Sequence, residues 1–286
     1  MNTAVIVGGS SSLGKALADL LHADPSWRVV TSGRTLSKDV GQFVDVRLKN
    51  SIYALIDEFR PSLIVNLVAT FDANFTESYQ LNVLTTKYIY ETIQQLDYPC
   101  RVVTIGSAAE YGVVAPQDNP IPETRALKPV SVYGLTKSWQ TLLAYQFSQQ
   151  GVDTVNCRVF NLIGPCMSSR LFVGSVQQQI RNLKSGQVSK ISVGPLGSIR
   201  DYVSTNEAAT QILAIAKFGK IGETYNIGSG HQTSMQCLLQ SMLASEGLTL
   251  ECVEEASIIS SRKGYDAPVI FADMAKTNDI LRTLED

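Results

Sequence analysis

The chain opens on an apolar run, a turn of small residues and a helical pattern, VIVGGSSSLGKALADLL, at residues 5–21. Glycine and serine between a strand and a helix let a phosphate approach the backbone, and the first turn of the helix offers free N–H groups and a positive dipole end. Serine replaces the middle glycine of G-x-x-G-x-x-G, so an ordinary strand-to-helix turn is the alternative interpretation. The residues of the predicted phosphate turn are Gly8, Ser11, Ser12, Leu13 and Gly14.

Short apolar, β-branched runs recur along the first half of the chain, with segments of helix length between them. Runs such as LIVNLV and RVVTIG are apolar on both faces, as strands are when helices cover both sides of a sheet. The alternation predicts an α/β fold with a doubly wound parallel sheet of the Rossmann type. The expected strands are Ala4–Val7, Arg28–Thr31, Leu63–Val68, Arg101–Ile105 and Thr154–Val159.

After about residue 160 the pattern becomes irregular, and loop-forming runs such as GPCMSS and GSGHQTS interrupt it. This change predicts a smaller C-terminal α/β lobe that binds the substrate. We expect the cofactor-binding Rossmann domain to cover residues 1–160 and about 204–228. The substrate lobe would then cover about 161–203 and 229–286.

Composition excludes several classes of function. The 286 residues carry a formal net charge of −2, which offers no positive field to attract nucleic acid or an anionic membrane. The five cysteines are scattered without CxxC spacing and the two histidines lie far apart, so neither a disulfide framework nor a metal site is expected. No apolar stretch reaches the length of a membrane span, and these features together predict a soluble, cytoplasmic protein.

Tyrosine and lysine four residues apart mark a candidate catalytic pair in SVYGLTKS. Tyr133 and Lys137 would share one helix face, where the lysine ammonium would favour the phenolate and lower the pKa of the tyrosine. Because this spacing is common by chance, a packed surface tyrosine is the alternative. Upstream, the strand in VVTIGSAAEYG delivers Ser107 to the carboxyl edge of the sheet, where ligands of open α/β sheets bind.

With these motifs the chain resembles the extended short-chain dehydrogenase/reductase family, the NAD(P)-dependent sugar-nucleotide epimerases, dehydratases and reductases. The resemblance also covers DVR, NLVAT, LNVLTT, RVFNLIGP, IRDYV and YNIGSG. Within the family, GSAAEYG and FNLIGP are most similar to the branch of GDP-6-deoxy-4-ketohexose reductases. The resemblance implies a homodimer formed through the helix that carries Tyr133 and Lys137 and the helix before it.

The resemblance also implies residue roles. Asp45 and Val46 would border the adenine of the cofactor, and Leu67 and Ala69 the ribose on the nicotinamide side. The substrate side would comprise Ser107, Ala108, Asn161 and Arg200.

Two of these substrate-side assignments have structural alternatives, and Cys166, which follows RVFNLIGP, has two candidate roles. Arg200 beside Asp201 would otherwise form a surface ion pair, and Asn161 would form a turn. Cys166 is either a second acid/base group, as in some epimerising relatives, or a small buried hydrophobic residue.

The end of the second predicted strand, VVTSGRT, indicates the cofactor. An NAD enzyme usually offers a carboxylate there to the ribose 2′-hydroxyl. This chain offers Arg34 instead, whose guanidinium suits a 2′-phosphate, so NADPH is predicted. The alternative is a solvated arginine in a turn.

We therefore expect an NADPH-dependent reductase of the 4-keto group of a nucleotide-diphosphate-linked 4-keto-6-deoxyhexose, an enzyme of deoxysugar biosynthesis. Tyr133 would donate the proton, Ser107 would hold the carbonyl oxygen, and Lys137 would bind the cofactor ribose. A 4-epimerase with bound NAD and a non-catalytic NADP-binding regulator are the alternatives. Related dehydratases carry Asp-Glu directly after the residue matching Ser107; this chain has Ala108 and Ala109, so dehydration is not expected.

Overall fold

A seven-stranded parallel sheet forms the centre of the computed structural model, which describes residues 1–37, 40–71, 73–255 and 267–284. The strand order is β11-β6-β5-β4-β1-β2-β3, and every neighbouring pair is parallel. This confirms the predicted fold class. The strands are β1 (Asn2–Val7), β2 (Trp27–Gly33), β3 (Gln42–Phe43), β4 (Leu63–Asn66), β5 (Arg101–Ser107), β6 (Thr154–Val159) and β11 (Thr224–Ile227).

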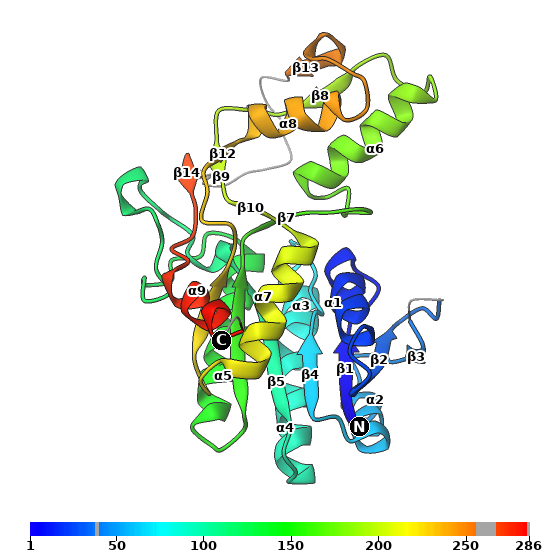
Figure 1. Cartoon of the computed structure of the whole chain (residues 1–286), viewed down its shortest axis with the longest axis vertical. Coiled ribbons are helices and arrows are strands. Elements are labelled where there is room, and N and C mark those ends of the chain that lie inside the picture. Colours follow the sequence, from blue (N-terminus) through cyan, green and yellow to red (C-terminus); the bar gives the residue numbers. More distant parts are fainter. Residues whose placement is uncertain (38–39, 72, 256–266, 285–286) are drawn as a thin grey trace.

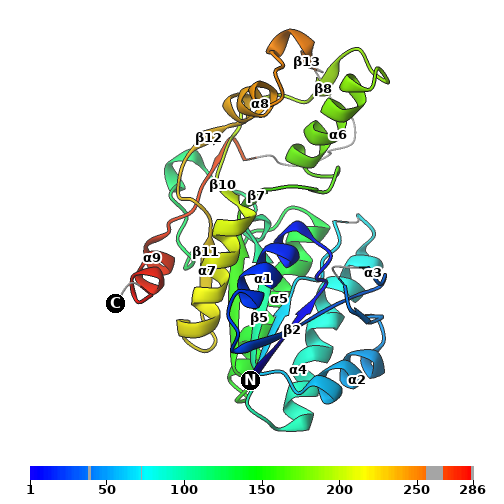
Figure 2. The ribbon, with the colours of Figure 1, turned by 45° about the vertical axis from the view of Figure 1, so that its right-hand side comes forward.

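Helices cover both faces of this sheet (Figure 2). One hydrophobic cluster joins the sheet to α1 and α7, and a second joins its other face to α2, α4 and α5. The C-terminal helix α9 packs against α7 and β11. The helices of this part are α1 (Ser12–His22), α2 (Lys49–Phe59), α3 (Phe75–Ser78), α4 (Thr85–Leu96), α5 (Val132–Ser148), α7 (Thr205–Phe218) and α9 (Ala275–Arg282), with a π-helical turn η1 (Tyr79–Leu84) before α4.

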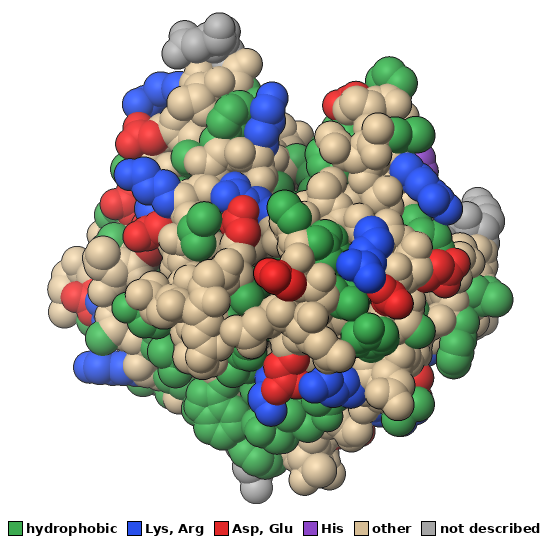
Figure 3. Space-filling view, turned by 90° about the horizontal axis from the view of Figure 1, so that it is seen from below, with side chains coloured by type: hydrophobic (Ala, Val, Ile, Leu, Met, Phe, Trp, Pro, Cys, Tyr) green, Lys and Arg blue, Asp and Glu red, His purple; other side chains and the backbone are tan. Residues whose placement is uncertain are grey.

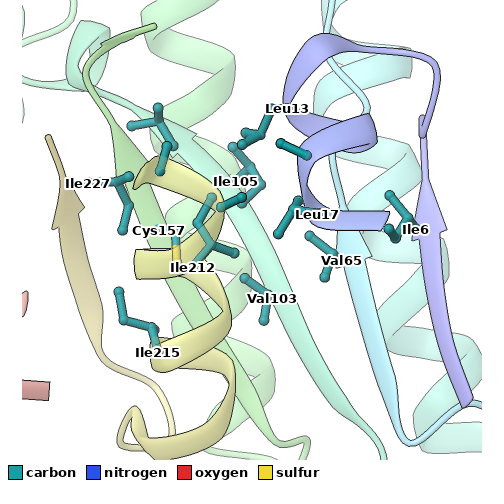
Figure 4. Packing of buried hydrophobic residues seen from close by; sticks show 14 of the residues in the cluster. Ile6, Leu13, Leu17, Val65, Val103, Ile105, Cys157, Ile212, Ile215 and Ile227 are labelled. Carbon is teal, nitrogen blue, oxygen red and sulfur yellow. The ribbon is translucent and has the colours of Figure 1, made fainter. Parts of the chain in front are cut away.

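The apolar pattern of the strands explains this layering. In β1 the residues Ala4–Val7 are apolar and buried, and they alternate between the cluster with α1 and α7 and the cluster with α2, α4 and α5. Figure 4 shows Leu17 of α1 and Ile212 of α7 on the same side of the sheet as Val65 and Val103. Each fully buried aliphatic side chain of this kind stabilises the fold by roughly 1.5–3 kcal/mol.

The remaining elements lie above the carboxyl ends of the sheet strands (Figure 1). They form three small sheets and a hydrophobic cluster of their own, in which Val176 and Ile180 meet Leu239 and Leu243. The elements are β7 (Asn161–Ile163), α6 (Phe172–Lys184), β8 (Ile191–Val193), β9 (Ile199–Arg200), β10 (Tyr202–Ser204), β12 (Thr233–Ser234), α8 (Met235–Ala244), β13 (Val253–Glu255) and β14 (Val269–Ile270), with short 3-10 turns η2 (Ala108–Glu110), η3 (Pro116–Asp118) and η4 (Leu250–Cys252).

Two surface properties bear on possible partners. Seen from below, basic and acidic side chains are interspersed over the face shown in Figure 3. Within the described ranges, no helix has both the length and the apolar character needed to cross a membrane.

Candidate active site

A cavity of about 700 Å³ lies where the carboxyl ends of the strands meet the upper elements. Its lining draws on the main sheet, on α5 and on the upper elements, so residues far apart in sequence share one space. Of the predicted site residues, those in the lining are Ser11, Ser12, Leu13, Leu67, Ala69, Ser107, Ala108, Tyr133, Lys137, Asn161 and Arg200. Those outside it are Gly8, Gly14, Arg34, Asp45 and Val46.

The turn between β1 and α1 has the features of a phosphate site. Gly8 has φ +84°, a conformation that favours glycine, and a Cβ on Gly14 would lie 2.6 Å from the Gly9 carbonyl oxygen. Ser11, which replaces the middle glycine, caps the helix: its Oγ accepts a hydrogen bond from Gly14 N at 3.0 Å. Ser12 Oγ is buried and has no hydrogen-bond partner among the described residues. An unpaired hydroxyl at a helix N-terminus fits a cofactor diphosphate.

Arg34 and Asp45 lie near each other beyond the end of β2. Arg47 donates two hydrogen bonds to the Asp45 carboxylate, at 2.7 and 2.9 Å. These bonds lower the pKa of Asp45 to about 2, and the positive charge of Arg34 contributes to the shift. Arg34 itself is exposed, so its guanidinium is free to meet a 2′-phosphate. Val46 is buried, and its carbonyl oxygen accepts a hydrogen bond from Thr85 Oγ1 at 3.2 Å.

Lys137 is held at the floor of the cavity. The helix α5 begins at Val132, where Ser131 Oγ caps it by accepting from Gly134 N at 3.0 Å. One turn later, Lys137 Nζ donates to the Ile105 carbonyl oxygen and to Gln140 Oε1, both at 2.8 Å. Burial lowers the pKa of Lys137 to about 8. The ammonium is thus oriented before any ligand arrives.

Tyr133 shares the face of α5 with Lys137, as its spacing predicts. Lys137 Nζ lies 5.9 Å from the centre of the Tyr133 ring. Burial nevertheless raises the pKa of Tyr133 to about 12, although a hydrogen bond with Ser107 lowers it in part. The expected lowering of this pKa by Lys137 is wrong for this structure, because the ammonium is directed at Ile105 and Gln140 and burial is the largest influence on the pKa of the phenol.

Sequence reasoning missed the polar layer behind these residues. Gln140 Nε2 donates to Thr86 Oγ1 at 2.6 Å, and Asn82 Nδ2 donates to Thr136 Oγ1 at 2.9 Å. Gln140 lies one helical turn after Lys137, a spacing that predicts contact and was an available signal. Thr86 and Asn82, by contrast, lie more than 50 residues before their partners on α5. This layer ties α5 to η1 and α4.

Phe71 is a second residue that the sequence did not indicate. It follows the NLVAT run after β4, lines the cavity and packs against Tyr133 with 4.4 Å between ring centres. Tyr133 therefore has an apolar wall on one side. Phe71 directly follows a motif of the family resemblance, which was the available signal.

Arg200 and Asn161, the two predicted diphosphate ligands, are fixed by local contacts. Arg200 Nη1 donates to the Ile199 carbonyl oxygen at 2.8 Å, and Asn161 Nδ2 donates to the Asp201 carbonyl oxygen at 3.0 Å. The Asp201 carboxylate accepts hydrogen bonds from Ser229, Gly230 and Ala272, which anchors this segment.

The environment of Cys166 does not match one of its two expected roles. It is exposed, lines the cavity and adopts φ +52°. The interpretation as a small buried hydrophobic residue is wrong, because the turn after RVFNLIGP places it on the cavity side.

The model of the NAD dependent epimerase/dehydratase family matches residues 4–228, which include the phosphate turn, Ser107, Tyr133, Lys137 and Arg200. The chain belongs to this family. Membership confirms the predicted resemblance and the predicted NAD(P)-dependent enzyme. The match also covers β11, the last strand of the sheet.

Two relatives of this chain are named for reactions of 6-deoxyhexose nucleotides. The dTDP-6-deoxy-L-talose 4-dehydrogenase (NAD(P)(+)) of Kitasatospora kifunensis is 25% identical over 87% of this chain and 80% of its own. The GDP-6-deoxy-D-mannose reductase of Pseudomonas aeruginosa is 26% identical over 62% of this chain and 59% of its own. Both names are those of enzymes that act on sugar nucleotides.

Solved structures of family members share the fold. The RMD protein from Pseudomonas aeruginosa, complexed with NADPH, has a TM-score of 0.83 at 22% identity and covers 98% of this chain and 91% of its own. The UDP-glucose 4-epimerase of Thermus thermophilus, complexed with NAD, has a TM-score of 0.82 at 21% identity and covers 97% and 92%. Both cofactors thus occur on this fold.

Proposed function

We propose that this chain is an NADPH-dependent reductase of the 4-keto group of a nucleotide-diphosphate-linked 4-keto-6-deoxyhexose. The observation that carries the proposal is one cavity that is lined by Ser107, Tyr133 and Lys137 and also by the turn after β1 and by Arg200. The 6-deoxyhexose names of two relatives support the substrate class. The predicted cytoplasmic location and the division into cofactor and substrate domains stay predictions.

The chemistry assigns one task to each residue. NADPH, when bound, supplies the hydride. Tyr133, whose pKa is raised and which therefore carries its proton at neutral pH, donates that proton to the carbonyl oxygen as the oxygen gains charge. Ser107 orients this oxygen, and Lys137 binds the ribose and carries positive charge near the phenolate. Arg200 and Asn161 hold the substrate diphosphate.

A panel of ketosugar nucleotides tests the proposal. Purified protein should oxidise NADPH when a 4-keto-6-deoxyhexose nucleotide is added, with a hydroxyl product. Neither Ala108 nor Ala109, both of which line the cavity, offers a proton donor or acceptor for elimination. Conversion of a hexose nucleotide to its 4-keto-6-deoxy product by this protein alone would contradict the reductase assignment, and 4-epimerisation with bound NAD would favour the alternative enzyme.

Arg34 is the residue that we expect to bind the 2′-phosphate of NADPH. Arg34→Ala should raise the KM for NADPH about 10- to 100-fold, because a charge-assisted bond to the 2′-phosphate contributes roughly 1.5–3 kcal/mol. The KM for NADH, which lacks that phosphate, should stay unchanged. The matched control is Arg60→Ala, an exposed arginine paired with Asp57 at the end of α2. An unaltered preference for NADPH over NADH in Arg34→Ala would contradict the cofactor assignment.

We also propose a homodimer through α4 and α5, as the family resemblance implies. On α5, Leu142 and Tyr145 are 58% and 57% exposed, and Trp139 packs edge-on against Tyr79 and Phe75 beside them. Large exposed apolar side chains on one helix face are typical of an interface.

Light scattering should therefore give twice the 31.2 kDa mass of one chain. Leu142→Asp should give a monomer at micromolar concentration, because it places a charge in the interface. Ile221→Asp, at an equally exposed position after α7, should remain dimeric. A monomeric parent chain would refute the proposal.

A further inference from the structure

Glu110 is a buried carboxylate directly behind the candidate site. It ends η2, and its side chain is fully buried without lining the cavity. Oε1 accepts a hydrogen bond from the backbone N of Ser107 at 2.7 Å. Oε2 accepts from Thr141 Oγ1 at 2.7 Å and from Arg158 Nε at 3.1 Å. Both oxygens are thus engaged by groups on different elements.

These three contacts join the elements that carry the reacting groups. Ser107 ends β5, Arg158 lies on β6, and Thr141 lies on α5 one turn after Lys137. The junction requires a glycine, since a Cβ on Gly106 would lie 2.4 Å from Glu110 Oε1. One carboxylate therefore sets the position of the strand bearing Ser107 relative to the helix bearing Tyr133 and Lys137.

The charge of Glu110 faces several other ionisable groups. From β6, Arg158 forms a buried ion pair with it at 3.1 Å and donates to Tyr111 Oη at 3.0 Å. From α5, Lys137 and Tyr133 feel its charge. Replacing a buried ion pair by apolar residues of similar volume is often neutral or stabilising, so stability alone does not account for this pair.

We propose that Glu110 is a positioning residue of the reaction, which fixes Ser107 against Tyr133 and places a negative charge behind the Lys137 ammonium. This inference rests on the proposed function of the site. It concerns a residue that touches neither substrate nor cofactor. Glu110 does not replace the acid/base pair of the dehydratases, because it lies outside the cavity and both of its oxygens are engaged.

The electrostatics give the proposal a measurable sign. Burial lowers the pKa of Lys137, and the charge of Glu110 raises it. Burial raises the pKa of Tyr133, and the same charge raises it further. Removing the charge therefore lowers both values, and the unneutralised Arg158 that remains acts in the same direction. The alkaline limb of the pH profile moves to lower pH whichever group sets it.

The variant Glu110→Gln tests this on the full chain. We expect NADPH binding near neutral pH within about twofold of the parent, kcat lower by about 10- to 100-fold, and the alkaline limb of kcat displaced downward by roughly 0.5 to 1 pH unit. The matched control is Glu207→Gln, which removes the capping-box carboxylate of α7, outside the cavity lining. This control should have the kcat of the parent and the same alkaline limb in its pH profile.

Two further measurements separate the possible failures. The pH dependence of NADPH affinity, followed by fluorescence, needs no ketosugar and should show the same downward shift in Glu110→Gln. A parent chain that reduces no ketosugar would end the proposed function, while this titration would still test Glu110. A folded Glu110→Gln variant with the kcat of the parent and the same alkaline limb in its pH profile would overturn the inference.

The variant Thr141→Val provides the test if Glu110→Gln does not fold. It removes only the α5 contact and should lower kcat several-fold while NADPH affinity is kept. An unchanged kcat would equally overturn the inference.

Discussion

Tyr133→Phe is expected to lower kcat by about 10²- to 10⁴-fold, the usual contribution of a positioned general acid. The variant keeps the ring that packs against Phe71 with 4.4 Å between centres, and loses only the hydroxyl hydrogen-bonded to Ser107. NADPH affinity should therefore stay near that of the parent. Steady-state kinetics with a 4-keto-6-deoxyhexose nucleotide and a fluorescence titration with NADPH measure the two quantities.

The control for this variant is Tyr53→Phe on α2, which lies outside the cavity lining. It should have the kinetics of the parent. Turnover of Tyr133→Phe close to that of the parent would remove Tyr133 from the chemistry, whatever its place in the cavity.

Lys137→Ala should impair both binding and turnover. We expect NADPH affinity to fall about 10- to 100-fold, since a charged donor to the ribose is lost, and kcat to fall by at least 10²-fold. Lys184→Ala, an exposed lysine on α6 paired with Glu246, serves as the control and should change neither. Full NADPH affinity in Lys137→Ala would contradict the assignment of Lys137 to the cofactor.

The same lysine predicts a dependence of stability on pH. Its pKa is about 8 in the folded chain, against 10.5 for a free lysine. Between these values the unfolded chain holds a proton that the folded chain has released, so the free energy of unfolding rises with pH, by about 3 kcal/mol over the window. Urea unfolding at pH 8 and pH 10 should show this contribution in the parent and its loss in Lys137→Ala. Identical pH dependence in both proteins would contradict the pKa assigned to Lys137.

The central strands could be predicted because they are short β-branched runs, apolar on both faces in β1 and β4 and on one face in β6. The run Thr154–Val159 is β6 to the residue, and β1 and β5 extend the predicted runs by two residues each. By contrast, β11 was not predicted as a strand. Its Asn226 is buried only because Nδ2 donates to the Ile121 carbonyl oxygen and Oδ1 accepts from Tyr111. No local pattern reveals partners that far away in sequence.

In the site, too, local sequence patterns indicated some residues, whereas contacts between distant residues could not be predicted. The spacing of Tyr133 and Lys137 and the strand that ends at Ser107 indicated the residues that line one cavity. The raised pKa of Tyr133 was beyond the sequence, because it depends on burial. Glu110 was missed for a related reason: its partners Thr141 and Arg158 lie more than 30 residues away.

The order of strands also determines when the sheet is finished during synthesis. β6 pairs on one side with β5, and its other edge is covered only by β11. The ribosome makes residues 160–223 between these two strands, which takes about 3 to 13 s at usual rates. For that interval the edge of β6 that later pairs with β11 has no partner strand, and another chain could add to it. Residues 160–223 include α6 and α7, so both helices are made before the last strand of the sheet.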